Sequence, residues 1–204
     1  MNGVDHLTRV TAQHAPVPCR ECVWWQTRPG SRPADRDRWA AETEDEFGPW
    51  GKLYADDQGK VIGLIQYGPS DGFARARTMP AGPPSRDAVL ITCAYLLDVH
   101  TPWVLQSLFL ATIGECRDRG VAALETFGYR HPRDETFAGR FLNHRTIFPA
   151  GFLHDFGFQA HRTAGRIELA RLDLRAIETA PERSALQALR ERLAVVSPAP
   201  AGAP

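Results

Sequence analysis

The sequence lacks the features that mark several large classes of protein. Its 24 basic and 24 acidic side chains cancel, so no strong field favours nucleic acid or an anionic membrane as a partner. No apolar run approaches the roughly 20 residues that a membrane-spanning helix needs. Four cysteines in 204 residues are too few for a disulfide scaffold, which favours a reducing compartment. We therefore expect a cytoplasmic protein that binds neither nucleic acid nor membrane.

Both ends of the sequence are poor in the patterns that form helices or strands. Residues 1–18 lack the apolar core of a secretory signal and finish with two prolines, so we expect a flexible N-terminal arm. Residues 197–204 alternate proline with small residues and are expected to be a disordered tail. Residues 19–196 suit a single domain, and a hydrophobic content of 43% is typical of a folded chain.

The first half of this domain predicts strand, helix, hairpin and loop in that order. Aromatic and β-branched residues at 22–26 are typical of a strand, and residues 33–47 mix apolar with acidic side chains as an amphipathic helix does. Two apolar runs, 52–55 and 61–67, flank a turn rich in Asp and Gly, which predicts a hairpin. Residues 68–87 contain several glycines and prolines and predict a long loop.

The middle of the chain predicts two buried strands joined by a helix. Residues 88–97 are almost continuously apolar, which is typical of a central strand covered on both faces. Residues 101–119 have Pro102 in the first turn, apolar side chains at helical spacing and Gly120 as the stop signal. Residues 121–128 form a second buried strand, which a crossover helix makes parallel to the first.

The remaining elements complete a mixed sheet. Residues 149–156 predict a short helix, and residues 158–161 and 166–174 predict paired strands. Residues 181–196 predict a last amphipathic helix. The chain is therefore expected to be one α+β domain.

This order of elements resembles the GNAT N-acetyltransferase superfamily over residues 18–175. Leu90 to Gly120, where a central strand runs into a helix, is similar to the acetyl-CoA segment of that family, and Phe152 to Phe158 is similar to its short helix ending in Gly-Phe. Pro18 to Trp25 resembles the opening of an actinobacterial branch. The resemblance implies a mixed, mostly antiparallel central sheet flanked by helices, with two parallel strands splayed to form a cleft.

The turn that would hold the cofactor departs from the family pattern. Members carry Arg/Gln-x-x-Gly-x-Gly/Ala there, whose small residues let backbone N–H groups close on a pyrophosphate at a helix N-terminus. The corresponding segment here is His100 to Leu105, in which Trp103 and Leu105 fill both glycine positions. Pro102 contributes no N–H. This acetyl-CoA turn is therefore degenerate.

Two further departures concern proton transfer. Leu153 stands where family members often carry a tyrosine that protonates the departing thiolate, and leucine has no proton to donate. Gln26 stands where the actinobacterial branch tends to have Glu, and an amide cannot act as a general base. Three changes in three places indicate a changed task.

Three residues are the candidates for catalysis, each with a structural alternative. Glu125 interrupts an apolar strand, where a buried carboxylate suits a general base or else pairs with a nearby arginine. His100 opens the helix and either binds phosphate or moves protons, or else flanks the helix beside Thr101 as N-cap. Tyr129, with His131, follows on the loop and either lines the same pocket or is solvated.

The resemblance also implies a set of cofactor-binding residues. The expected cofactor is acetyl-CoA or another acyl thioester, near Leu96, Leu97, Asp98, His100 and Trp103. Backbone N–H groups near Leu96 and Leu97 would polarise the thioester carbonyl. Alternatively, Trp103 fills the space that the pyrophosphate vacates.

Metal binding is not expected from the cysteines or histidines. Cys19-x-x-Cys22 is a pattern for half a zinc site or a redox pair, but no second such pair follows. Cys93 and Cys116 fall on a strand and a helix, and no two histidines have a ligand spacing. We therefore predict structural thiols and no metal.

Two hypotheses of function follow. The first is a GNAT-type N-acyltransferase that acts on the amine of a small molecule, with atypical binding of the acyl donor and Glu125 or His100 as the base. The alternative is a non-catalytic binding module, or a repurposed enzyme that does not use acetyl-CoA, which the filled turn and Leu153 favour. Either protein could be a monomer or a homodimer.

Overall fold

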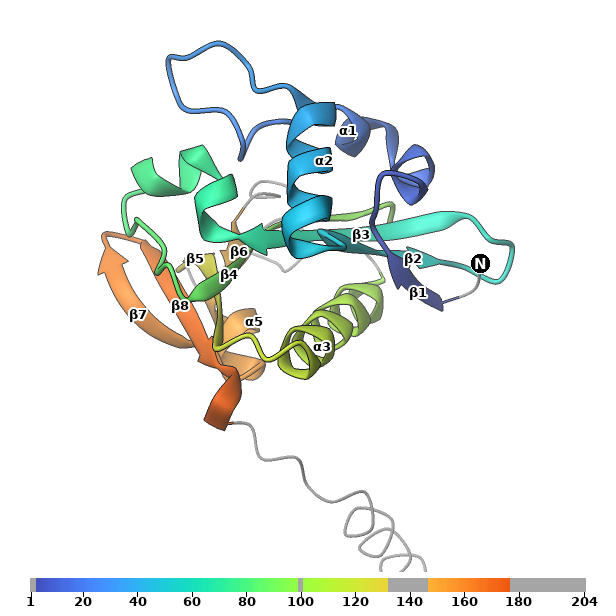
Figure 1. Ribbon diagram of the computed structural model, residues 1–204. Coiled ribbons are helices and arrows are strands. Elements are labelled where there is room, and N and C mark those ends of the chain that lie inside the picture. Colours follow the sequence, from blue (N-terminus) through green and yellow to red (C-terminus); the bar gives the residue numbers. More distant parts are fainter. Residues whose placement is uncertain (1–2, 99–100, 132–146, 177–204) are drawn as a thin grey trace, which may run out of the picture. The chain divides into compact units, whose positions relative to one another are not determined.

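A computed structural model describes residues 3–98, 101–131 and 147–176 of the chain (Figure 1). All elements below except the last short helix lie within one compact unit, residues 1–174. Within it, an eight-stranded sheet has the order β1-β2-β3-β4-β5-β8-β7, and β6 pairs with β5 off this path. The strands are β1 Gly3–His6, β2 Gly51–Ala55, β3 Val61–Pro69, β4 Ala88–Leu96, β5 Ala123–Tyr129, β6 Phe148–Pro149, β7 Gln159–Ala164 and β8 Ile167–Asp173.

Helices cover both faces of this sheet, with α1 and α2 on one face and α3 and α5 on the other (Figure 1). Their bounds, with those of the short 3-10 helices, are α1 Val17–Arg20, α2 Arg36–Phe47, α3 Pro102–Asp118, α5 Ala150–Asp155, η1 Thr11–His14, η2 Ser70–Gly72, η3 Ala74–Thr78 and η4 Leu174–Ala176. In the described residues no helix is both long and apolar enough to cross a membrane.

The fold class predicted from the sequence is confirmed. The pairs β1–β2, β2–β3, β3–β4, β5–β8 and β7–β8 are antiparallel. Only β4–β5 and β5–β6 are parallel among the described strands. The crossover helix α3 joins β4 to β5, as its apolar spacing predicts. Gly63 lets α3 approach the sheet closely, because a Cβ there would lie 2.5 Å from Val104 Cγ1.

The N-terminal part of the chain differs from the sequence prediction. Where a flexible arm is expected, Gly3–His6 form the edge strand β1, and Leu7 and Ala15 are buried in the core. The predicted strand at residues 22–26 is wrong: Trp24 to Gln26 form a turn. The aromatic run is buried by ring packing instead of strand pairing, since Trp25 stacks on Phe127 at 5.7 Å between ring centroids.

Other boundaries change little. The predicted helix at 33–47 begins at Arg36 because the Asp35 side chain accepts a hydrogen bond from the Arg38 N–H at 3.0 Å and caps it. The expected loop at 68–87 contains η2 and η3. The predicted helix at 181–196 and the tail at 197–204 lie outside the described residues.

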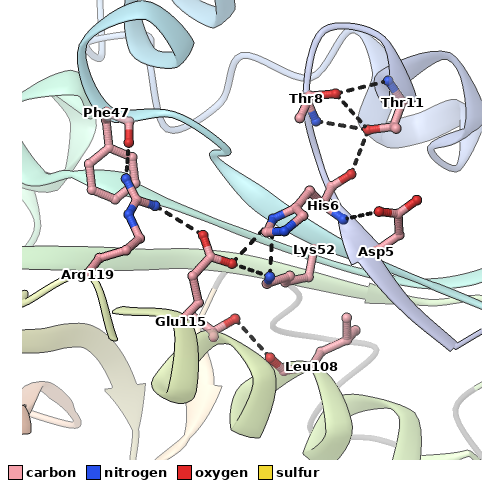
Figure 2. A network of polar contacts seen from close by, with 10 residues as sticks. Asp5, His6, Thr8, Thr11, Phe47, Lys52, Leu108, Glu115 and Arg119 are labelled. Atoms are coloured by element: carbon pink, nitrogen blue, oxygen red, sulfur yellow. Dashed lines mark hydrogen bonds and ion pairs between the residues drawn. The ribbon is translucent and has the colours of Figure 1, made fainter. Parts of the chain in front are cut away.

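A buried ion network ties α3 to the strands beneath it (Figure 2). One oxygen of Glu115 pairs with the Lys52 ammonium of β2, and the other lies 3.1 Å from Nη1 of Arg119. His6 Nδ1 of β1 lies 3.3 Å from Glu115 and 3.2 Å from the Lys52 ammonium. The Lys52 and Glu115 side chains are only 8% and 13% exposed. The network therefore joins β2 to α3 through charges largely removed from water, and the half-exposed His6 extends it to β1.

Candidate active site

The two parallel strands at the centre of the sheet separate along their length. β4 pairs with β5 only from Ala88 to Ile91, although β4 continues to Leu96. β8 occupies the other edge of β5 over its whole length, so β6, which pairs with Gly128 and Tyr129, lies on the edge that β4 leaves. No described strand pairs with this edge of β4 beyond Ile91. The predicted splay is therefore present.

Backbone donors at the end of β4 are only partly free. The Leu97 N–H donates to the Ile62 carbonyl at 2.8 Å, on the β3 side. Because successive N–H groups of a strand point to opposite edges, the Leu96 N–H points toward the edge that β5 has left. Of the two backbone N–H groups expected to polarise a carbonyl, that of Leu96 points toward the open edge, whereas that of Leu97 is already hydrogen-bonded to β3.

The start of α3 is shaped by local contacts. The Thr101 hydroxyl, just before α3 begins, donates to the Asp98 carbonyl at 2.6 Å. The half-exposed Trp103 ring packs edge-to-face on Tyr54 of β2, with ring centroids 5.2 Å apart. β2 lies on the far side of β4 from β5, so Trp103 leans away from the splay. His100 lies outside the described residues.

Glu125 is fully buried, and its carboxylate is held by hydrogen bonds from Ser85 and Arg171. Ser85 donates to its two oxygens from the backbone N–H and from the hydroxyl, both at 2.7 Å, and Arg171 Nη1 donates at 3.0 Å. Arg171 also binds Asp87, and that hydrogen bond raises the pKa of Arg171. This geometry fits the structural alternative for Glu125, in which the carboxylate pairs with an arginine. Glu125 thereby anchors the 70–87 loop to β5 and β8.

The structure brings Tyr129 and His131 together. Their rings meet edge-to-face with centroids 4.6 Å apart, at the carboxyl end of β5. Both line a cavity of about 300 Å³ beside the start of α5, and Glu125, with which they are expected to share a pocket, is not among its lining residues. The other lining residues are Arg130, Pro149, Ala150, Gly151 and His154.

A histidine–carboxylate pair in this cavity is not anticipated from the sequence. His154 Nε2 lies 2.8 Å from Oε1 of Glu168, whose side chain is 2% exposed against 46% for the histidine. Glu168 lies opposite Gly128, where a Cβ would stand 3.0 Å from Glu168 Cγ and 3.1 Å from Leu153 Cδ1. Gly128 therefore leaves the space that the carboxylate needs. The signal in the sequence is an acid in the apolar strand beginning at Ile167, the pattern that singles out Glu125.

This pair is suited to moving protons. With Glu168 ionised, Nε2 of His154 donates the hydrogen bond and Nδ1 keeps a lone pair. A buried carboxylate thus fixes both the ring orientation and the tautomer of a histidine that lines a cavity. The arrangement is that of an oriented general base.

The cysteines are not linked by disulfides. All four are free thiols, and in the described residues no three His, Cys, Asp or Glu side chains are placed to hold a metal. Burial raises the pKa of Cys93 and of Cys116 to about 12, which keeps both as thiols at neutral pH.

A helix joins β4 to β5, and these two strands separate near the middle of a mostly antiparallel sheet. This arrangement is the one that the resemblance to the GNAT superfamily implies.

Comparisons with known proteins give structural neighbours and no relatives in sequence. No model of a protein family and no curated protein matches the chain. The ribosomal-protein-S18-alanine N-acetyltransferase of Escherichia coli is 14% identical, with a TM-score of 0.48 over 89% of this chain and 99% of its own. YncA of Salmonella typhimurium, a putative acetyltransferase solved with acetyl-CoA, is 17% identical, with a TM-score of 0.49 over 88% and 96%. YhbS of Escherichia coli, a GNAT family N-acetyltransferase solved with CoA, is 15% identical, with a TM-score of 0.45 over 84% and 80%.

Proposed function

We propose that this chain is a GNAT-type N-acyltransferase that acts on the amine of a small molecule. The observation that supports it most is the separation of β4 from β5, which leaves the β5-side edge of β4 without a described strand partner from Thr92 to Leu96, while β3 pairs with the other edge. An extended ligand with amide groups can hydrogen-bond to such an edge as an added strand does. The proposed donor is acetyl-CoA or another acyl thioester, whose pantetheine arm carries such amides.

The first turn of α3 supports an atypical grip on this donor. Pro102 has no N–H, and the Val104 N–H already donates to the Thr101 carbonyl at 3.0 Å. Leu105 is fully buried in the core. Few amide donors are therefore left for a pyrophosphate. We expect the edge of β4, more than the helix N-terminus, to bind the donor.

In the proposed reaction the amine attacks the thioester carbonyl, a C–N bond forms and the C–S bond breaks. The Leu96 N–H donates to the carbonyl oxygen as negative charge develops there. The attacking nitrogen loses its proton to His154, which Glu168 orients, and the Tyr129 hydroxyl protonates the departing thiolate. His100, acting through a water, is the second candidate for the base.

Calorimetric titration with acetyl-CoA and with free CoA tests the donor. Saturable binding near 1 μM, about −8 kcal/mol, supports the proposal. If the edge of β4 supplies most of the binding free energy, the dissociation constant of acetyl-pantetheine should lie within about tenfold of that of acetyl-CoA, a difference of about 1.4 kcal/mol. No heat and no thermal shift from either thioester at about 1 mM would exclude both as donors.

Release of free thiol in the presence of a panel of small amines tests the chemistry. His154→Gln removes the proposed base and is expected to lower kcat/KM by about 100-fold. His161→Gln, at an exposed position on β7, is the matched control and is expected to change nothing. Equal rates for the two variants would contradict the role of His154.

A non-catalytic binding module is the second candidate, and the first turn of α3 favours it. A chain that has lost amide donors for the pyrophosphate need not use a CoA donor. No binding of acetyl-CoA or CoA, and no thiol release with any amine, is the result expected of such a module.

A further inference from the structure

A second cavity, of about 280 Å³, lies between the N-terminal segment and α2. It is lined by Arg9, Ala12, Arg20, Arg36, Asp37, Ala40 and Trp50. None of these residues lines the cavity that holds Tyr129 and His154. Its volume far exceeds the 10–15 Å³ or so that one water needs. The lining combines three guanidinium groups with one carboxylate and a small apolar surface.

Arg36 is the least compensated of these cations. Its guanidinium carbon lies 4.4 Å from the ring centre of Trp50 and 4.9 Å from that of Trp39. No ion pair joins Arg36 to any carboxylate of the described residues, and its Nη1 is buried without a hydrogen-bond partner. A long hydrogen bond of 3.5 Å runs from its Nε to the Arg20 carbonyl. Burial lowers the pKa of Arg36, which is the physical sign of a charge held away from water.

The neighbouring charges leave the cavity positive. Arg20 donates from Nε to the Ala15 carbonyl at 2.7 Å and forms no ion pair with a described carboxylate. Arg9 pairs with Glu44 and Asp45 outside the lining. Asp37 is the one acid of the lining; it is exposed, and its charge acts to raise the pKa of Arg36, against the larger effect of burial.

A buried guanidinium without a counter-ion is costly, and an oxyanion is the partner that its planar donors fit best. The Trp39 and Trp50 rings, whose centroids are 5.4 Å apart, lie to one side of the Arg36 guanidinium. Its N–H groups point outward from the edge of its plane, where a carboxylate or phosphate is bound. Ala12, Ala40 and Trp50 offer apolar contact to the rest of such a molecule. We propose that this cavity binds the carboxylate or phosphate group of a small molecule with an apolar or aromatic body.

Titration of the full chain with benzoate, phenyl phosphate and inorganic phosphate tests this site. Because Arg36 stacks on Trp39 and Trp50, binding is expected to change tryptophan emission as well as to release heat. Whichever of benzoate and phenyl phosphate has the lower dissociation constant identifies the oxyanion that the cavity prefers. Inorganic phosphate shows how much the aromatic body contributes.

Variants separate the site from general attraction to positive charge. Arg36→Gln removes a charged donor and is expected to weaken binding at least about tenfold. Arg38→Gln is the matched control, since Arg38 lies on the same helix, is exposed, pairs with Glu42 and does not line the cavity. Arg36→Lys keeps the charge and loses the planar fork, so intermediate binding is expected. It also serves if Arg36→Gln does not fold.

The proposal fails if none of the three probes binds saturably at about 10 mM or below. It fails equally if Arg38→Gln and Arg36→Gln weaken binding to the same extent. The assay uses neither a thioester nor an amine acceptor, so its result is independent of the proposed acyl transfer.

Discussion

Replacing Glu115 by Gln removes the only carboxylate that the described residues place against the Lys52 ammonium. The lysine is 8% exposed, so its charge would remain in a poorly solvated place, with His6 Nδ1 and the neutral amide oxygen of the substituted side chain as acceptors and no counter-charge. Arg119 would lose an ion pair in the same substitution. Removing one partner of a buried pair costs about 3–5 kcal/mol. Because Glu115 keeps some contact with water, we expect about 2–4 kcal/mol.

The assay is urea denaturation at neutral pH, with thermal unfolding as a second measure. For a chain of this length each kcal/mol shifts the midpoint by roughly 2–4 °C, so a fall of about 4–16 °C is expected. A double-mutant cycle with Lys52→Met isolates the pair, and it should recover part of the loss because no unpaired charge then remains. A cost below about 0.5 kcal/mol, or strict additivity in the cycle, would refute the reasoning.

The same network gives stability a definite dependence on pH. Desolvation by burial acts to raise the pKa of Glu115, but the Lys52 hydrogen bond and charge outweigh it, and the net direction is a lowered pKa. A carboxyl group with a lowered pKa contributes stability above its ordinary value, here 4.5, and loses it as the pH falls through the folded value. Acid unfolding below about pH 4.5 should therefore be steeper in the wild type than in Glu115→Gln.

Three further substitutions or modifications test other parts of the structure. Arg171→Met leaves Glu125 buried without its cation and should cost about 3 kcal/mol in urea denaturation, whereas a loss under about 1 kcal/mol would contradict this pairing. Gly128→Ala introduces a Cβ 3.0 Å from Glu168 Cγ, so we expect about 1 kcal/mol of destabilisation together with slower thiol release. An unchanged rate of thiol release would show that Glu168 does not take part in catalysis. A thiol reagent at neutral pH should label the exposed Cys22 in the native chain before the buried Cys116, and mass spectrometry shows whether that order is reversed.

Elements with a strong hydrophobic period are predicted well from the sequence. Residues 88–97 and 101–119 appear as β4 and α3 within a residue or two, because continuous burial and helical spacing leave few alternatives. The run at 22–26 has strand composition but no strand partner, since Trp25 is satisfied by Phe127. The edge strand β1 has too few apolar residues to be recognised, and only its pairing with β2 reveals it.

The candidate site illustrates why a buried acid is recognisable in a sequence while its role is not. Glu125 and Glu168 both interrupt apolar strands, and each is buried as that pattern predicts. Their functions differ through partners that lie 14 to 46 positions away in the chain: Ser85 and Arg171 enclose Glu125, whereas Glu168 holds His154.

Access to a cavity then decides which buried acid can assist a reaction. A carboxylate whose two oxygens are both bound by buried or structural donors cannot exchange a proton with a ligand without breaking those hydrogen bonds. Glu168 is hydrogen-bonded to His154, which is half exposed and lines a cavity. A proton can therefore reach solvent or substrate through His154. The proposed proton transfer should therefore depend on Glu168 of β8 and His154 of α5. A conservative substitution of Glu125 that keeps the 70–87 loop anchored should leave it unchanged.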